Sequence, residues 1–325
     1  MFGHRLLKMA AWPGERRFAV GRAHLESVQR QKLALLLRKV AACEAGQRQG
    51  VAAHWQWETF AEQVPVSDYD HWRDPVDRAR EYGGNALIQS PVVRYQPTSG
   101  STSAIKWIPY TRHFLSELDN AISPWIVDLY RQFPRLRQGR HYWSMSWVPT
   151  SLRDNMREDI NDDIQLMSMG KRLLAGATQA VPQDVSLART SEDSLFATLA
   201  YLISDSSLSM MSIWSPTFGL GLLKSMAMWR EELAEVLATG SWGNRMLGSN
   251  TQSCPRSPGG AELLRQWDGR LSADFFMALW PSLALVSAWD TAASGPWARQ
   301  LHALLPQAAF QGKGLWATEG VVTIP

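Results

Sequence analysis

A run of small hydroxyl residues that ends in a lysine is the segment of this sequence best suited to chemistry. It starts at Thr98, ends at Lys106 and contains, between them, Ser99, Gly100, Ser101, Thr102 and Ser103. Small residues let backbone N–H groups surround anionic oxygens, hydroxyls add donors, and lysine adds a point positive charge. The segment predicts a phosphate-binding loop, with an ordinary serine-rich surface loop as the alternative. A Walker A loop is excluded, because that motif needs Gly-Lys followed by Ser or Thr.

A second candidate for chemistry lies near the end of the sequence, where Thr318 is followed by Glu319 and Gly320. A carboxylate beside a hydroxyl can hold Mg²⁺ together with a phosphate oxygen. Magnesium is commonly bound by one or two carboxylates plus phosphate groups. The pair is a weak signal alone, and it indicates a place where Mg²⁺ and a phosphate could meet.

The elements expected around the first segment are two helices and a strand. Apolar side chains repeat at helical spacing over residues 28–40, and Gly46 is the expected stop. The same pattern over residues 111–131 predicts a second helix, which Pro124 should kink or split. Residues 86–95 are apolar and partly β-branched, so we expect a strand that leads into the serine-rich turn.

Helices and strands continue to alternate toward the C-terminal end. Strands are expected over residues 141–148, 208–214, 283–289 and, interrupted by a turn, 314–324, and helices over residues 218–238 and 297–305. Residues 240–260 are rich in Gly, Ser, Asn and Pro and should form a surface loop. The alternation predicts an α/β fold with mixed sheets flanked by helices.

The composition excludes several classes of protein. Of 325 residues, 45% are hydrophobic and 19% are charged, so the chain has enough apolar surface to fold and is not expected to be disordered. The net charge of +3 is too small to indicate nucleic acid or an anionic membrane as a partner. The 16 tryptophans are expected to fill the core.

Signals for export, membrane insertion and metal binding are weak. Residues 1–17 lack the apolar region of a signal peptide, and the longest uncharged stretch, residues 206–223, contains five serines and a proline. The two cysteines, Cys43 and Cys254, suit free thiols in a reducing compartment, so a cytoplasmic location is expected. The seven histidines have no zinc-ligand spacing, and the acidic residues of 153–165 do not fit an EF-hand.

Together, the two candidate segments resemble the phosphate loop and the downstream Thr-Glu motif of the acyl-adenylate-forming superfamily. The context is similar to the Gretchen Hagen family, the auxin-responsive acyl-acid amido synthetases and their bacterial relatives. Its motifs occur here in order, as Val-Pro-Val-Ser-Asp-Tyr over 64–69, the loop and its continuation over 98–111, Trp-Ser-Pro-Thr-Phe over 214–218, and Gly-Lys-Gly-Leu-Trp-Ala-Thr-Glu-Gly over 312–320. The resemblance covers about residues 25–325.

The resemblance implies an ATP- and Mg²⁺-dependent reaction in two steps. A carboxylic acid is first adenylated with release of pyrophosphate, and the amine of an amino acid then displaces AMP to form an amide. By motif position, Lys106, Thr318 and Glu319 are catalytic, with Thr318 facing the α-phosphate and Glu319 holding Mg²⁺. The residues implied in nucleotide binding are Thr98, Ser99, Gly100, Ser101, Thr102, Ser103, Lys106, Trp316 and Thr318. Those implied in the acyl pocket are Ser215, Pro216, Thr217 and Phe218.

The resemblance also implies that residues 1–325 form one large N-terminal adenylate-forming domain, truncated at its end and without the family's small C-terminal lid domain. Ser103 stands where the superfamily usually has glycine, and Leu315 stands where an aromatic residue opens the Thr-Glu motif. Two alternatives therefore stay open: a non-catalytic nucleotide- or acid-binding module or degenerate fragment, and an adenylating enzyme with a thiol acceptor. We expect a monomer whose partners are small acids and amines.

Overall fold

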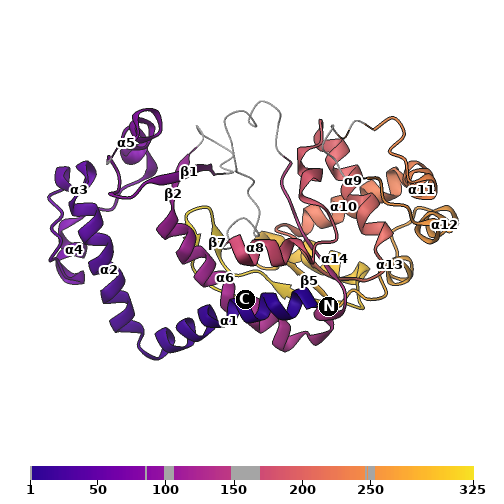
Figure 1. Ribbon diagram of the computed structural model, residues 1–325, viewed down its shortest axis with the longest axis horizontal. Coiled ribbons are helices and arrows are strands. Elements are labelled where there is room, and N and C mark those ends of the chain that lie inside the picture. Colours follow the sequence, from indigo (N-terminus) through magenta and orange to yellow (C-terminus); the bar gives the residue numbers. More distant parts are fainter. Residues whose placement is uncertain (1, 85, 99–105, 148–168, 246, 248–252) are drawn as a thin grey trace. The chain divides into compact units, whose positions relative to one another are not determined.

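The structure is a computed structural model that describes residues 2–84, 86–98, 106–147, 169–245, 247 and 253–325. The chain forms two compact units, coloured by sequence in Figure 1. Unit 1 comprises Met1–Trp12, Trp125–Trp316 and Val322–Pro325, and unit 2 comprises Pro13–Pro124 and Ala317–Val321. The acidic segment of residues 153–165 lies outside the described residues.

Unit 1 is built on a parallel sheet of four strands in the order in which they occur along the chain. These strands are β3 (Arg140–Trp143), β4 (Leu208–Ser212), β5 (Leu285–Ala288) and β6 (Ala309–Gly312). Every residue of β4 and β5 is buried, as expected for a parallel sheet covered by helices on both faces. The strands predicted near residues 141, 208 and 283 are confirmed, whereas β6 was not predicted because Gln311 and Gly312 weaken its pattern.

Helices fill the connections between these strands. They are α8 (Met169–Gly176), α9 (Ser191–Ser204), α10 (Pro216–Met228), α11 (Arg230–Thr239), α12 (Pro258–Gln266), α13 (Ala273–Leu279) and α14 (Gly295–Leu304), with short 3-10 turns η1 (Pro134–Gln138), η3 (Gln183–Leu187) and η4 (Ala292–Ser294). The prediction of a single helix over residues 218–238 is wrong, because the helix is interrupted at Trp229, which caps the end of α10 and the start of α11. The core between these helices includes the fully buried Trp280, whose Nε1–H donates to the Leu202 carbonyl over 2.8 Å.

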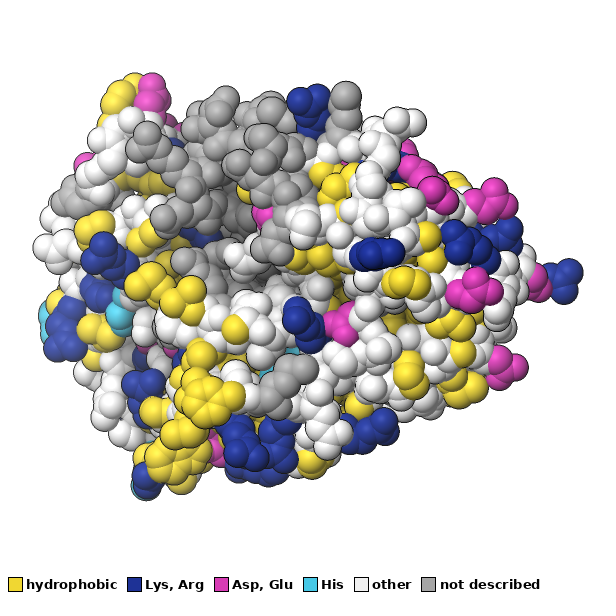
Figure 2. Space-filling view, turned by 45° about the vertical axis from the view of Figure 1, so that its right-hand side comes forward, with side chains coloured by type: hydrophobic (Ala, Val, Ile, Leu, Met, Phe, Trp, Pro, Cys, Tyr) yellow, Lys and Arg dark blue, Asp and Glu magenta, His cyan; other side chains and the backbone are white. Residues whose placement is uncertain are grey.

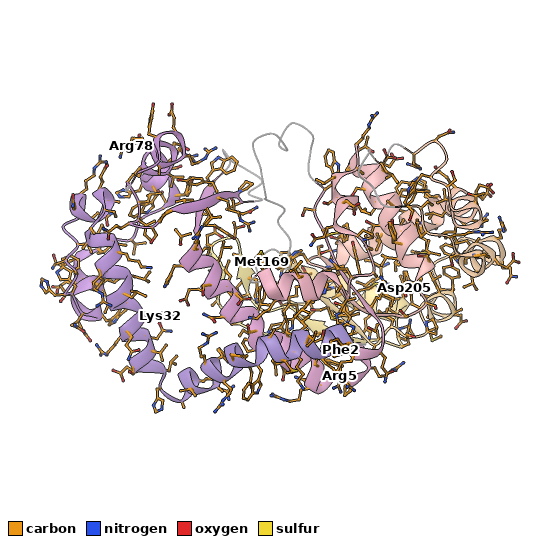
Figure 3. All side chains as sticks on the ribbon, in the orientation of Figure 1. Phe2, Arg5, Lys32, Arg78, Met169 and Asp205 are labelled. Atoms are coloured by element: carbon orange, nitrogen blue, oxygen red, sulfur yellow. The ribbon has the colours of Figure 1, made fainter. Side chains whose placement is uncertain are left out.

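The first part of α1 (Phe2–Ala23) is anchored in unit 1 by a buried histidine pair. His4 Nε2 donates to the Gly139 carbonyl over 2.7 Å, and its Nδ1 accepts from the Tyr130 hydroxyl over 2.9 Å. His141 Nε2 donates to the Leu136 carbonyl over 2.9 Å, and the two imidazole centroids are 4.5 Å apart. Phe2 and Arg5, labelled in Figure 3, are on the exposed part of the same helix. Burial lowers the pKa of both histidines, that of His141 to about 3.

Unit 2 contains α2 (Leu25–Ala41), α3 (Glu44–Arg48), α4 (Trp57–Gln63), α5 (Tyr69–Tyr82) and the start of α6 (Arg112–Gln132). The helix predicted to end at Gly46 ends at Ala41, and Gly46 lies inside α3, where a Cβ would clash with the Val40 carbonyl. The helix predicted over residues 111–131 is confirmed as α6, and it is not split at Pro124. Lys32 on α2, labelled in Figure 3, pairs with Glu117 on α6.

Unit 2 also contains the strands β1 (Val92–Pro97) and β2 (Trp107–Thr111). They pair antiparallel, with Tyr95 opposite Pro109 and Pro97 opposite Trp107. The predicted strand over residues 86–95 starts later, at Val92, directly after Pro91, which has no N–H to pair. Near the C-terminal end, β7 (Trp316–Ala317) and β8 (Gly320–Val321) form a short ladder, which is the predicted interrupted strand.

Two further observations concern the helices and the charged surface. Among the described residues, no helix is both long and apolar enough to span a bilayer. On the face drawn in Figure 2, Lys and Arg side chains are scattered among acidic and hydrophobic ones rather than gathered in one basic patch.

Candidate functional site

The two ends of the predicted phosphate-binding loop are joined at the tip of the β1–β2 hairpin. The Thr98 backbone N–H donates to the Lys106 carbonyl over 2.9 Å, which extends the ladder of the two strands by one step. The loop residues themselves lie outside the described part of the chain, namely Ser99, Gly100, Ser101, Thr102 and Ser103. The hairpin therefore fixes the positions of Thr98 and Lys106, the described residues on either side of the loop.

The Thr-Glu motif is tied to the strand that follows the loop. The Tyr110 hydroxyl on β2 donates to the Thr318 backbone carbonyl over 2.7 Å, and both residues belong to unit 2. Burial raises the pKa of Tyr110 to about 12, the Arg94 guanidinium opposes that rise, and the nearby Glu319 carboxylate adds to it. The hydroxyl therefore stays protonated and remains a donor at neutral pH.

Lys106 and Tyr110 share one face of the hairpin. Side chains alternate between faces along a strand, so positions 106, 108 and 110 point to the same side. Since the Tyr110 hydroxyl binds the Thr318 backbone, the strand that follows Lys106 also holds the Thr-Glu motif, and both belong to unit 2. Glu319 has an exposed side chain there, while Thr318 is half-buried.

This arrangement fits the way in which magnesium is held in nucleotide complexes. Among the residues that the structure describes, no group of three or more His, Cys, Asp or Glu side chains could hold a metal without other ligands. Glu319 supplies a single exposed carboxylate. Mg²⁺ is usually bound by one or two carboxylates together with phosphate oxygens and water, so Glu319 suits an ion that is bound with a nucleotide.

Trp316 lies in unit 1, within a cluster of tryptophans. It is 8% exposed, its Nε1–H donates to the Thr323 carbonyl over 2.9 Å, and its ring centroid lies 5.5 Å from that of Trp125 and 6.2 Å from that of Trp214. The preceding residue, Leu315, is 62% exposed, as expected when neighbours in a strand point to opposite faces. Trp316 therefore packs the core, and its role in nucleotide binding stays a prediction.

The predicted acyl-pocket segment begins α10 in unit 1. The Ser215 hydroxyl accepts from the Thr217 backbone N–H over 3.2 Å, and Pro216 occupies the first helical turn, where it loses no hydrogen bond. Phe218 is partly exposed on the first turn of the helix. The Ser-Pro-Thr sequence thus explains the start of a helix that follows β4, and contact of these four residues with an acid stays a prediction.

Sequence reasoning missed a lysine at the carboxyl end of the parallel sheet. Lys313 Nζ donates to Ser212 Oγ over 3.0 Å, and it lies 4.3 Å from the ring centroid of Trp214 and 5.3 Å from that of Trp125. Ligands of α/β proteins bind at this end of the strands. The signal that could have found it is a lysine between two glycines directly after a short strand.

Tyr110 was also missed as a site residue. It stands in the segment that continues from the loop, but nothing in the sequence connects it with Thr318, which is 208 positions away. From the sequence, Tyr110 is equally consistent with an ordinary core residue, and its ring is indeed buried. Only the folded chain shows that its hydroxyl joins the two motifs.

Comparisons with known proteins agree with the resemblance read from the motifs. A profile described as the GH3 family N-terminal domain matches residues 16–310. A search of curated proteins finds no significant match. Among solved structures, a GH3.15 acyl acid amido synthetase matches with 17% sequence identity and a TM-score of 0.69, over 90% of this chain and 52% of that chain.

A second solved structure, AtGH3.15 acyl acid amido synthetase in complex with 2,4-DB, matches with 17% identity and a TM-score of 0.70, over 92% of this chain and 54% of that one. At this identity the match shows a shared fold, and the chain spans about half the length of these structures. The profile covers most of the chain. The chain belongs to the GH3 family, whose N-terminal domain its residues 16–310 represent.

Proposed function

We propose that this chain takes part in the ATP-dependent adenylation of a carboxylic acid and in its transfer to the amine of an amino acid or a similar compound. The observation that carries the proposal is the Tyr110–Thr318 hydrogen bond, which joins the loop-bearing hairpin to the Thr-Glu motif within unit 2. Family membership and the acid named in the AtGH3.15 structure support a carboxylic acid as the substrate class.

In the first step, a carboxylate oxygen attacks the α-phosphorus of ATP, a P–O bond breaks, and pyrophosphate leaves. In the second, the amine nitrogen attacks the acyl carbon, AMP leaves, and the nitrogen loses a proton as the amide forms. Both steps concentrate negative charge on phosphate oxygens, so fixed positive charge and hydrogen-bond donors lower the barrier. Mg²⁺, when bound, adds further positive charge to the phosphates.

The residues of this chain have separate tasks in that scheme. Lys106 brings an ammonium to the phosphates from the end of the loop, and backbone donors of residues 98–106 surround the oxygens. Thr318 offers its hydroxyl to the α-phosphate, and Glu319 holds Mg²⁺. Residues 215–218 contact the acid, and a weak carboxylate nucleophile needs to be aligned with the α-phosphorus before it can attack.

The test is calorimetric titration with MgATP, followed by acid-dependent exchange of labelled pyrophosphate into ATP with a panel of aromatic and aliphatic acids. We expect Lys106→Ala and Glu319→Gln each to lower exchange by at least about 100-fold, the effect of removing one charge-stabilising group in a transition state. Lys224→Ala and Glu62→Gln, which change exposed side chains on α10 and α4, are the matched controls.

The outcomes separate the open alternatives. Undiminished exchange in both site variants would refute the site assignment. Tight MgATP binding with no exchange for any acid would favour a non-catalytic binding module. If the enzyme forms a product when a thiol is added but not when an amine is added, the thiol-acceptor alternative is favoured.

A further inference from the structure

Tyr69, which lies outside the two nucleotide motifs, contacts the backbone next to Lys106. It is the first residue of α5 and the last residue of the Val-Pro-Val-Ser-Asp-Tyr segment, to which the proposed function gives no task. Its hydroxyl oxygen lies 2.7 Å from the Trp107 backbone nitrogen and 3.3 Å from the Trp107 carbonyl oxygen. One hydroxyl thus accepts from the N–H and donates to the carbonyl of the same residue.

The two backbone groups of Trp107 belong to the edge of β2 that faces away from β1. The Lys106 carbonyl accepts from Thr98 across the hairpin, so the polar groups of Lys106 face β1 and those of Trp107, one residue on, face outward. Pro109 lies two residues further on the same edge, where a missing N–H is tolerated. Among the described strands, only β1 pairs with β2, so the Tyr69 hydroxyl occupies the place of a second neighbouring strand.

The same tyrosine also contacts the lysine. Lys106 Nζ lies 5.8 Å from the centroid of the Tyr69 ring, and the Arg73 guanidinium lies 5.1 Å from it. Cations are attracted to the negative face of an aromatic ring at such distances. The ring is held at the start of α5, because the Asp68 side chain accepts from the His71 backbone N–H over 3.3 Å and caps the helix.

We propose that Tyr69 is a positioning residue for Lys106: its hydroxyl fixes the backbone of the next residue, and its ring limits the space that the ammonium can occupy. The inference rests on the proposed function, in which that ammonium neutralises phosphate charge. It assigns a task to residues 64–69, namely to present one tyrosine at the first turn of α5. Tyr69 contacts no reacting atom in this scheme.

The geometric part is tested without a nucleotide, by amide hydrogen exchange at Trp107 in the 325-residue chain. Tyr69→Phe keeps the ring and removes the hydroxyl, and we expect the Trp107 amide to exchange about tenfold faster, the effect of one lost hydrogen bond. Tyr82→Phe, at the other end of α5 and 75% exposed, is the matched control and should leave that amide unchanged. Equal exchange in wild type and Tyr69→Phe would overturn the proposal.

The link to Lys106 is tested by a double-mutant cycle on MgATP affinity. We expect Tyr69→Phe to weaken binding about tenfold in the wild-type background and less than about twofold in the Lys106→Ala background, because a residue that acts through another has no effect once that other is gone. Equal effects in both backgrounds would overturn the positioning role while leaving the proposed function intact. If the wild-type chain binds no MgATP, the proposed function fails, and the exchange rate at Trp107 alone decides whether Tyr69 holds this backbone.

Discussion

The sheet of unit 1 and the hairpin of unit 2 hold their strands in different ways. β4 and β5 have a strand on each side, and all their side chains are buried, so close packing fixes them. Among the described strands β2 has one neighbour, and the hydroxyls of Tyr69 and Tyr110 supply further contacts. The difference shows that the stability of this chain depends mainly on the close packing of buried side chains in unit 1. The geometry of its nucleotide motifs depends instead on a few directional hydrogen bonds in unit 2.

The largest effect is expected from emptying the core of unit 1. Trp280→Ala removes a fully buried indole and its hydrogen bond to the Leu202 carbonyl, so the free energy of unfolding should fall by about 3–5 kcal/mol. Urea unfolding followed by circular dichroism measures the loss. Trp297→Ala, at a side chain that is 47% exposed on α14, is the control and should cost far less. Similar losses in both variants would contradict the view that packing decides the stability of unit 1.

A slightly smaller loss is expected at the close approach of Gly139 to β4. A Cβ at this position would clash with the Ser207 backbone carbonyl, and the Gly139 carbonyl also accepts from His4. Gly139→Ala should therefore destabilise the chain by about 2–3 kcal/mol, the range for overpacking that moves backbone. Gly259→Ala, in α12 where nothing lies near the added methyl group, is the matched control and should be neutral or slightly stabilising. If Gly139→Ala leaves the free energy of unfolding unchanged, the backbones at Gly139 and Ser207 can move apart at little cost.

The buried histidines give unit 1 a pH dependence. Burial lowers the pKa of His4 and His141 below the ordinary 6.5, so the unfolded chain binds more protons than the folded chain below that pH. Stability should be fully present above about pH 6.5 and fall as the pH decreases, by up to about 1.4 kcal/mol per pH unit for each histidine. Unfolding in urea at pH 7, 6 and 5 should show this slope, and His141→Gln should reduce it. His54→Gln, at an exposed position, controls for the substitution itself.

The smallest effect on stability is expected in unit 2. Tyr110→Phe removes the hydrogen bond to Thr318 and should cost about 1 kcal/mol of local stability. Amide exchange over residues 316–321 should rise several-fold, while the core amides of β4 and β5 stay protected. Tyr82→Phe again serves as the control. Faster amide exchange throughout unit 1 in Tyr110→Phe would show that the packing of unit 1 depends on the hydrogen bonds of unit 2, contrary to this comparison.

Helices and strands with a clear apolar pattern were predictable from the sequence. Elements whose position depends on single tertiary contacts were not. The apolar stripes of α2 and α6 were found because burial of one helix face imposes a period, and the apolar centres of β4 and β5 were found because a strand buried on both faces is a short apolar run. The break at Trp229 was missed, since its neighbours on both sides continue a helical stripe. Propensity also does not reveal β2, whose Pro109 is acceptable only because it faces an unpaired edge.

The candidate site was predictable as two motifs but not as an arrangement. Thr98, Lys106, Thr318 and Glu319 follow from their residue types and order, and the structure places all four in unit 2. The Tyr110 and Tyr69 contacts span 208 and 38 positions, and a tyrosine at either place is equally consistent with an ordinary core residue. Such contacts depend on tertiary structure, which local patterns do not encode.

The outward edge of β2 has a consequence for association between molecules. An unpaired strand edge is a template on which another chain can add a strand, and this leads to domain swapping or aggregation. Here Pro109 offers no N–H, and both polar groups of Trp107 are already bonded to a side chain of the same molecule. Within the part of the chain that the structure describes, the outward edge of β2 therefore offers few free groups on which a second copy could add a strand.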